Sequence, residues 1–383
     1  MDRGSYQILY QMNLNVLQAA YGDCMILKSG SQYESSQTDS HHFLIDGGPA
    51  STYNIGLKEE LQNIREKGGR VDLLIVSHVD NDHINGLLKL MQDLCLQKTS
   101  NKRWTIEIDA LWYNAFSRTI GQRIEGRLRN LLRNTRTLFK TRSRALMTVR
   151  GIREGHDLYQ YAHELGIEIN PQFNNDTIVV NDKPKELKFG NLKFLVIGPT
   201  RKNLEDLREE WLDWLDKHEK ARKTRADYRL AIQADKSIPN LSSIMFLAKE
   251  DDDTILFTGD GLGEHVIYVL KQARLLGSSR STHVNILKLP HHGSDRNITR
   301  DFFTNVTPDK YLISANGRDD NPSFLTLSWI AETAKEQHRQ VEIILTNNTP
   351  NVERFVKKYP KDKYGYKLKL MKKGLHSMNL KLE

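Results

Sequence analysis

The stretch Ser77-His78-Val79-Asp80-Asn81-Asp82-His83 decides the fold of this chain. It follows the largely apolar run 71–76, which predicts a buried strand, and it precedes the run 84–91, which predicts the start of a helix. Two histidines and two aspartates therefore lie on a tight loop at the carboxyl end of a strand. Imidazole and carboxylate groups are the ligands that hydrolytic metal sites use. The alternative is a polar loop whose aspartates cap the helix, but four such side chains within six residues favour a metal site.

Two further strand ends carry the same kinds of side chain. The predicted strand 254–258 ends in Gly259-Asp260-Gly261, and the predicted strand 285–289 ends in Pro290-His291-His292-Gly293-Ser294. A pair of histidines in one turn is a weak signal when it stands alone. Combined with the loop 77–83 and with Asp260, at three separate strand ends, it predicts one site built from distant parts of the chain.

The composition is that of a soluble globular protein of one large or two ordinary domains. The chain has 383 residues, of which 38% are hydrophobic and 27% are charged. No apolar run is long enough to cross a membrane, and the first residues do not resemble a signal peptide, so we expect a cytoplasmic protein without a membrane partner. Cys24 and Cys95 each lie in an apolar run, which predicts buried free thiols in a reducing compartment.

The formal net charge of +8 favours a polyanionic partner, and nucleic acid is the one we expect; the sequence leaves partner proteins unknown. Arginine is concentrated between residues 115 and 153, where apolar residues recur at helical spacing. The basic side chains of one predicted helical face are Arg129, Arg133, Arg136 and Lys140. This face is either a surface that follows the phosphates of a nucleic acid or an ordinary solvated helix face, and the sequence leaves both open.

Taken together, these motifs resemble the metallo-β-lactamase-fold hydrolases. The loop 77–83 is similar to the ComEC-type branch, which carries His-x-Asp-x-Asp-His, and Asp80 stands where the commoner superfamily loop has a histidine. The resemblance covers nearly the whole chain and implies an α/β fold, the αββα four-layer sandwich with helices outside two facing sheets. Residues 1–114 would form the first half of that domain, 115–186 a basic helical insertion, and 187–383 the second half.

The resemblance also implies two divalent metal ions, zinc or manganese. His78 and Asp80 would hold one ion, Asp82 and His83 would hold the other, and Asp260 would bridge them. Either His291 or His292 would complete the second site. Asp82 and Asp260 would take part in catalysis directly, whereas the residues expected to support the ligands without binding metal are Asp46, Ser294 and Asn114. Because Asp80 replaces an imidazole, the site is harder and suits manganese better than a histidine-rich zinc site does.

Two departures from the family leave roles open. Asn321-Pro322 stands where the ComEC-type pattern has His-Pro, so any ligand or proton donor from that position is in doubt. The superfamily also offers a histidine between the first loop and the bridging aspartate. The side chains that could supply this ligand here are His156, His163, His218 and Asn114.

The implied chemistry is hydrolysis by a metal-activated hydroxide that attacks phosphorus or a carbonyl carbon. The function we predict is a phosphodiesterase or nuclease on DNA, possibly single-stranded, or on RNA. One alternative is a hydrolase of a small phosphodiester or of a carboxylic ester or lactone. Another is a non-catalytic nucleic-acid-binding module with a decayed site. One core supports all three.

Overall fold

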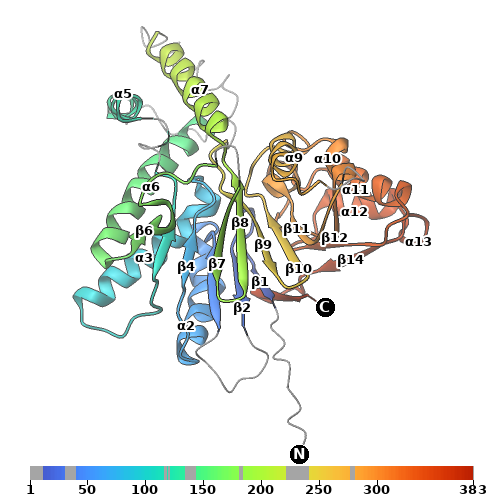
Figure 1. The fold of residues 1–383 in the computed structure, drawn as a ribbon, viewed down its shortest axis with the longest axis horizontal. Coiled ribbons are helices and arrows are strands. Elements are labelled where there is room, and N and C mark those ends of the chain that lie inside the picture. Colours follow the sequence, from blue (N-terminus) through green and yellow to red (C-terminus); the bar gives the residue numbers. More distant parts are fainter. Residues whose placement is uncertain are drawn as a thin grey trace, which may run out of the picture.

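A computed structural model describes residues 12–30, 40–115, 119, 121–133, 144–180, 184–220, 241–276 and 281–382. Within these residues the chain forms a seven-stranded and an eight-stranded β-sheet that face each other. Helices cover the outer side of each sheet (Figure 1). The predicted αββα four-layer sandwich is therefore confirmed.

The first sheet has the strand order β15-β1-β2-β3-β4-β5-β6. Its strands are β1 (Asn13–Leu17), β2 (Met25–Ser29), β3 (His41–Ile45), β4 (Leu73–Ile75), β5 (Ala110–Trp112), β6 (Glu168–Ile169) and β15 (Ser377–Lys381). Strands β1 to β3 pair antiparallel, whereas β3 to β6 pair parallel. The last strand of the chain, β15, returns to pair with β1, so the two ends of the described chain lie in one sheet.

The second sheet has the order β14-β13-β12-β11-β10-β9-β8-β7. Its strands are β7 (Lys185–Phe189), β8 (Leu192–Gly198), β9 (Met245–Glu250), β10 (Asp253–Phe257), β11 (Thr282–Lys288), β12 (Val306–Ile313), β13 (Val341–Leu345) and β14 (Tyr366–Leu370). Strands β7 to β10 pair antiparallel, and β10 to β14 are parallel. The turn Gly190-Asn191 joins β7 to β8, as its sequence indicates.

The outer layers are helical. The first sheet is covered by α1 (Ala50–Thr52), the π-helix η2 (Tyr53–Leu57), α2 (Lys58–Glu66), α3 (Asn81–Thr99) and α6 (Arg144–Leu165). The second is covered by α9 (Gly263–Gln272), α10 (Arg300–Asn305), α11 (Phe324–Glu336), α12 (Pro350–Lys358) and α13 (Lys361–Tyr364). Short 3-10 turns are η3 (Pro171–Phe173), η5 (Pro290–Gly293) and η6 (Arg318–Asp320). None of the described helices is both long and apolar enough to cross a membrane.

Three apolar layers hold the sandwich together, one between the sheets and one under each helical layer. The layer between the sheets is rich in aromatic rings. Phe43 of the first sheet and Phe194 of the second lie 4.8 Å apart between ring centroids, and Phe194 also contacts Phe246 at 4.9 Å. Burying each such ring stabilises the fold by roughly 1.5–3 kcal/mol. Cys24 and Cys95 are buried free thiols, as predicted.

Helices α5 (Gln122–Arg133) and α7 (Arg201–Lys220) lie together at the top of Figure 1. The guanidinium of Arg127 on α5 pairs with Asp216 at 2.5 Å and with Glu219 at 2.8 Å, both on α7. A segment that the sequence shows as almost purely basic therefore receives acidic partners from a distant helix. The side chains of Arg129 and Arg133 and the whole of Arg136 and Lys140 lie outside the described residues.

Candidate metal centre

The site forms where strands of both sheets end at one edge. Strands β3 and β4 are parallel, as are β10 and β11, so the residues that follow each pair emerge together. The loop after β4 carries Ser77 and His78, and Asp80 is the residue that precedes the first turn of α3. Asp82 and His83 lie within that first turn. The turn between β1 and β2 packs directly on it: a Cβ on Gly22 would come within 1.9 Å of the Asp82 carbonyl oxygen.

Asp46, which follows β3, holds the loop 77–83 in place. Its carboxylate accepts hydrogen bonds from the Ser77 backbone nitrogen at 2.7 Å and from the Ser77 hydroxyl at 2.6 Å. The same carboxylate lies 2.8 Å from Nδ1 of His83. An Nδ1–H that donates to Asp46 leaves the lone pair of Nε2 on the far side of the ring. Asp46 therefore aims His83 at the centre of the site.

Asp260, which follows β10, lies at the centre of this group with its two oxygens facing different partners. Oδ1 is 3.3 Å from Nε2 of His83 and 3.7 Å from Nε2 of His292. Oδ2 is 3.6 Å from Nε2 of His78 and 3.9 Å from Nε2 of His291. One carboxylate thus stands between two pairs of imidazole nitrogens. This is the arrangement that a carboxylate needs to bridge two cations.

Each pair of imidazoles is completed by another carboxylate. Asp82 Oδ2 lies 3.6 Å from Nε2 of His292, and Asp80 Oδ2 lies 3.7 Å from Nε2 of His78. Two groups result, which share Asp260: one of His78, Asp80 and His291, and one of Asp82, His83 and His292. We call these seven residues the His–Asp cluster. The sequence left open which of the two adjacent histidines joins Asp82 and His83, and the structure places His292 there.

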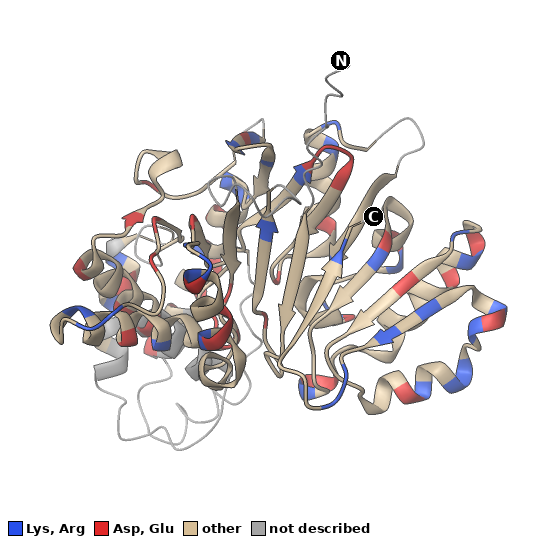
Figure 2. Ribbon diagram, turned by 90° about the horizontal axis from the view of Figure 1, so that it is seen from below, with Lys and Arg blue, Asp and Glu red and all other residues tan. Residues whose placement is uncertain are grey.

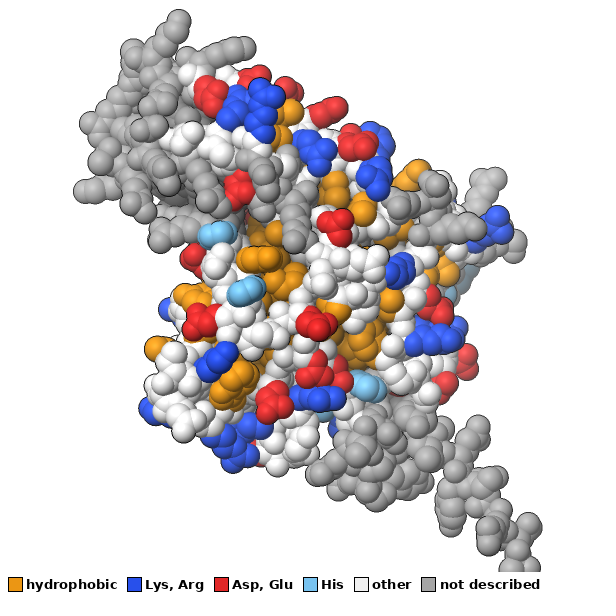
Figure 3. All heavy atoms as spheres, turned by 60° about the vertical axis from the view of Figure 1, so that its left-hand side comes forward, with side chains coloured by type: hydrophobic (Ala, Val, Ile, Leu, Met, Phe, Trp, Pro, Cys, Tyr) orange, Lys and Arg blue, Asp and Glu red, His pale blue; other side chains and the backbone are white. Residues whose placement is uncertain are grey.

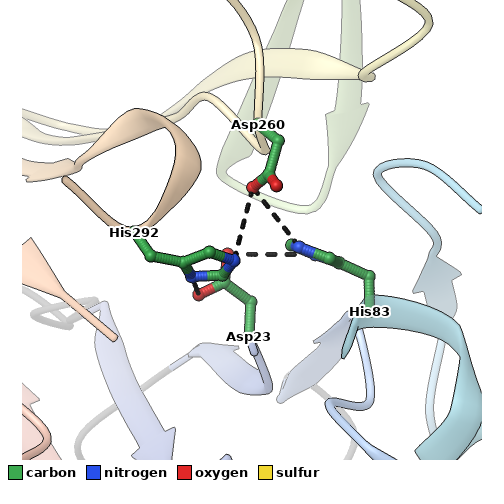
Figure 4. A group of neighbouring side chains, drawn as sticks. All are labelled: Asp23, His83, Asp260 and His292. Atoms are coloured by element: carbon green, nitrogen blue, oxygen red, sulfur yellow. Dashed lines mark ion pairs between the residues drawn. The ribbon is translucent and has the colours of Figure 1, made fainter. Parts of the chain in front are cut away.

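The donor atoms of the His–Asp cluster fit a divalent metal. The Nε2 atoms of His83 and His292 are buried and have no hydrogen-bond partner among the described residues. Their separations from the neighbouring carboxylate oxygens resemble the about 3.3–3.6 Å between tetrahedral ligands that bond lengths of 2.0–2.2 Å produce. Buried nitrogens that lack a hydrogen bond are costly unless a cation takes their lone pairs. Figure 4 shows both rings turned toward Asp260.

Asp23 is a site residue that the sequence analysis missed. It is fully buried in the β1–β2 turn and lies with His83, Asp260 and His292 in a group whose ligand atoms are within 4.8 Å of one another. Its carboxylate, however, faces the Nδ1 edges of the rings, 3.5 Å from His292 and 3.9 Å from His83. It also pairs with Lys288. We therefore assign it to orienting the rings, and the turn Gly22-Asp23, which repeats the pattern of Gly259-Asp260, was the available signal.

The histidine turn has an unusual backbone. His291 and His292 adopt left-handed φ values of 46° and 55°, and Gly293 follows at 80°. Such a conformation costs non-glycine residues on the order of 1 kcal/mol each or more and persists only where its surroundings hold it. The Nδ1 atom of His292 lies 2.9 Å from the Ser314 carbonyl oxygen, which receives its proton and leaves Nε2 for the cluster. Asn321 donates from its amide to the His291 carbonyl oxygen at 3.4 Å, so this departure from the ComEC-type pattern supports the turn.

The buried carboxylates and the histidines of the cluster shift one another's pKa values. Burial lowers the pKa of His292, but the carboxylates of Asp260 and Asp23 outweigh burial and raise that pKa to about 10. The same balance raises the pKa of His83 well above its ordinary value. For Asp260, burial raises the pKa, but His83 and His292 outweigh it and hold the pKa well below the usual range. Protons on these histidines occupy, in the metal-free protein, the place that a cation would take.

The remaining predicted residues lie outside the His–Asp cluster. Ser294 is buried after the histidine turn, and its hydroxyl accepts from the Arg296 backbone nitrogen at 3.4 Å. The Asn114 amide exchanges two hydrogen bonds with the backbone of Ile178, at 2.8 and 2.9 Å, and so fixes that segment. His156 and His163 are exposed on α6, and the side chain of His218 is not among those described. No further histidine ligand emerges from these described candidates.

Comparison with known families supports this site. Residues 36–95 match the family model of the metallo-beta-lactamase superfamily. The matched segment contains Asp46 and the whole loop 77–83. No curated protein matches the chain. The match and the buried group of Asp23, His83, Asp260 and His292 together indicate a metal-dependent hydrolase, since members of that superfamily typically bind divalent metals, often zinc.

Proposed function

We propose that this protein is a metal-dependent phosphodiesterase that acts on nucleic acid, with two divalent ions at the His–Asp cluster. The observation that carries the proposal is the position of Asp260, whose two oxygens each face two imidazole nitrogens at 3.3–3.9 Å. Two divalent ions held by these residues would supply an activated water and would stabilise the charge that develops on a phosphoryl group. His78, Asp80 and His291 would hold one ion, and Asp82, His83 and His292 the other.

Residues of the protein orient the histidine ligands and place a guanidinium at the rim of the site. Asp46 and the Ser314 carbonyl fix the tautomers of His83 and His292 so that both Nε2 atoms face inward. At the rim, the Arg318 guanidinium stacks on the Tyr21 ring at 4.0 Å, which keeps a cation beside the cluster. A planar guanidinium suits a phosphate group in particular. Asp319 lies at the same rim, 3.8 Å from Arg318, so the guanidinium favours a phosphate over a neutral ester by its planar donors and not by an excess of positive charge.

The shape of the site argues against a small-ester hydrolase. The hollow lined by Tyr21, Asp82, His292 and Arg318 measures about 30 Å³, which is room for only a few water molecules. Small molecules are usually enclosed by pockets of about 300–1,000 Å³. A shallow hollow instead suits a polymer that lies across the surface and presents one phosphodiester to the metals. The intact ligand set also speaks against a non-catalytic module.

The test measures how fast the purified protein, with manganese or with zinc, cleaves three substrates. These are labelled single-stranded DNA, a chromogenic small phosphodiester and a chromogenic carboxylic ester. We expect metal-dependent cleavage of DNA and weaker cleavage of the small phosphodiester. Asp260→Asn should abolish both activities, whereas Asp252→Asn, in the exposed β9–β10 turn, should leave them unchanged. Cleavage of the carboxylic ester alone would replace the proposal by the small-ester alternative, and inactivity on all three would favour the binding module.

A further inference from the structure

The C-terminal part of the second sheet carries most of the net charge of this protein. Residues 353–373 contain nine Lys and Arg against two Asp and Glu, a net charge of +7, and the whole chain has +8. The nine are Arg354, Lys357, Lys358, Lys361, Lys363, Lys367, Lys369, Lys372 and Lys373, and all are exposed. We call them the C-terminal basic surface. It covers α12, α13 and the edge strand β14, on the right-hand side of Figures 1 and 2.

The charges of this surface are not neutralised by neighbours. None of the nine forms an ion pair with another residue in the described part of the chain. The acidic residues that border it on α11 have other partners: Glu336 pairs with Arg300 at 2.5 Å, and Glu332 accepts from the Tyr359 hydroxyl at 2.6 Å. The left-hand side of the molecule in Figure 1 differs, because basic and acidic side chains are interspersed there, as Figure 3 shows. Lys58, for example, pairs with Asp93 at 2.7 Å.

Three of the nine basic side chains lie in a row on the outward face of α12. Val352 and Phe355 are buried against the sheet, so Arg354, Lys357 and Lys358 share the outward face at helical spacing. Arg354 lies over the Phe324 ring at 4.2 Å, which keeps this guanidinium near the helix surface. An open hollow on the same face is lined by Pro350, Glu353, Arg354, Lys357 and Lys358.

The row begins at the rim of the His–Asp cluster. Asn351, in the first turn of α12, donates to the carbonyl oxygens of Asp320 at 2.8 Å and Pro322 at 3.2 Å. The loop that contains them also carries Arg318 and Asn321, which line the hollow over the cluster. Helix α12 is about 13 Å long and extends from this rim. That length spans on the order of four phosphates of a B-form strand.

We propose that the C-terminal basic surface binds the phosphate backbone of a nucleic-acid strand and leads it from α12 into the hollow over the His–Asp cluster. The inference rests on the proposed function, and it assigns strand binding to this surface and not to the basic insertion. A row of exposed ammonium and guanidinium groups complements the repeating phosphates of a strand, whose counterions are released when the phosphates bind. An anionic membrane would meet the same charges, but the strand is favoured because the row ends at a site for phosphodiester cleavage.

Binding is measured by fluorescence anisotropy with a labelled single-stranded oligonucleotide in excess chelator, so that no cleavage is needed. Lys357→Glu with Lys361→Glu should weaken binding by about tenfold at low salt. It should also reduce the slope of log K against log salt by about 1.4, since each phosphate contact on a single strand contributes about 0.7. The matched control is Lys188→Glu with Lys193→Glu. These exposed, directly opposed lysines of the β7–β8 hairpin lie at the other end of the strands from the cluster, and their reversal should leave binding unchanged.

The possible outcomes distinguish a failure of the proposed binding surface from a failure of the proposed enzymatic function. Equal losses in both double variants would show a general charge effect and overturn the proposal, as would unchanged binding in the α12–α13 variant. A loss confined to Arg129→Glu with Arg133→Glu would move strand binding to the insertion. Stronger binding to phosphatidylserine vesicles than to the oligonucleotide would make the surface a membrane contact. Asp260→Asn should bind the oligonucleotide as the wild type does. If the wild type binds but never cleaves, only the proposed function fails.

Discussion

Asp23 and Lys288 form a buried ion pair that joins the two sheets beside the His–Asp cluster. Asp23 lies in the β1–β2 turn of the first sheet and Lys288 ends β11 of the second, with side chains 0% and 1% exposed. Lys288 also donates to the carbonyl oxygen of Gly259 at 3.3 Å, next to Asp260. Asp23 in turn faces the Nδ1 edges of His83 and His292. One pair therefore links the relative position of the sheets to the orientation of the ligands.

Removing one partner of this pair should destabilise the protein. Lys288→Met leaves the Asp23 carboxylate buried without its main counter-charge, which costs about 3–5 kcal/mol in the free energy of unfolding. Chemical denaturation in excess chelator measures this loss without a contribution from bound metal. Asp23→Asn combined with Lys288→Met should recover part of it, because neither member of the pair is then left as a buried charge without its partner. Lys249→Met on the exposed face of β9 is the control and should change little. Wild-type stability in Lys288→Met would contradict the role we give the pair.

Asp260→Ala should remove both metal ions. Elemental analysis of the wild type should find about two divalent ions per chain. The variant should hold almost none, because the two oxygens of this one carboxylate face both groups of ligands. Asp252→Ala, in the β9–β10 turn, should keep the wild-type content. Retention of one ion in Asp260→Ala would show that the carboxylate serves a single site.

Asp80→His and Asp82→His should have different effects, although both put an imidazole into the same loop. Asp80 is partly exposed and lies 3.7 Å from His78, so a ring there can replace the carboxylate and should shift preference from manganese toward zinc. Asp82 packs under the Gly22 turn, where a Cβ on Gly22 would come within 2.9 Å of the Asp82 Cβ. The larger ring should displace the second ion and reduce hydrolysis by at least about 100-fold. Rates against metal identity for both variants test this, and an unchanged preference in Asp80→His would exclude Asp80 as a ligand.

Metal binding should release protons and weaken as the pH falls. Burial lowers the pKa of His292, but Asp260 and Asp23 raise it to about 10, and Asp260 and Asp46 likewise raise the pKa of His83. His292 is therefore charged at pH 7 without metal and must lose a proton to bind it, and the raised pKa of His83 acts in the same direction, so we expect at least about one proton released per chain. Titration calorimetry in buffers of different ionisation enthalpy counts them. Zero released protons would show that both rings are already neutral in the metal-free protein.

The sequence by itself determined which strand ends carry ligands. The metal-ligand pattern of the loop 77–83 can be recognised from the sequence alone, because its four histidine and aspartate side chains are neighbours in the chain. A predicted strand and a predicted helix fix the loop on both sides. Gly259-Asp260 and His291-His292 are equally local. Parallel strands deliver such loops to one edge of a sheet, so the pattern of strands and turns was sufficient to predict one site at such an edge, whereas the sandwich was predicted from the resemblance to the metallo-β-lactamase fold.

Only the tertiary structure decided the contacts between residues that no local pattern connects. It placed His291 and His292 on different oxygens of Asp260, because consecutive left-handed residues turn the two rings apart. It brought Asp23 to Lys288 across the two sheets, and it gave Arg127 acidic partners on α7. Strand periodicity records which face of a strand is buried but not which strand of the opposite sheet it meets. That information exists only once the apolar layer between the sheets has packed.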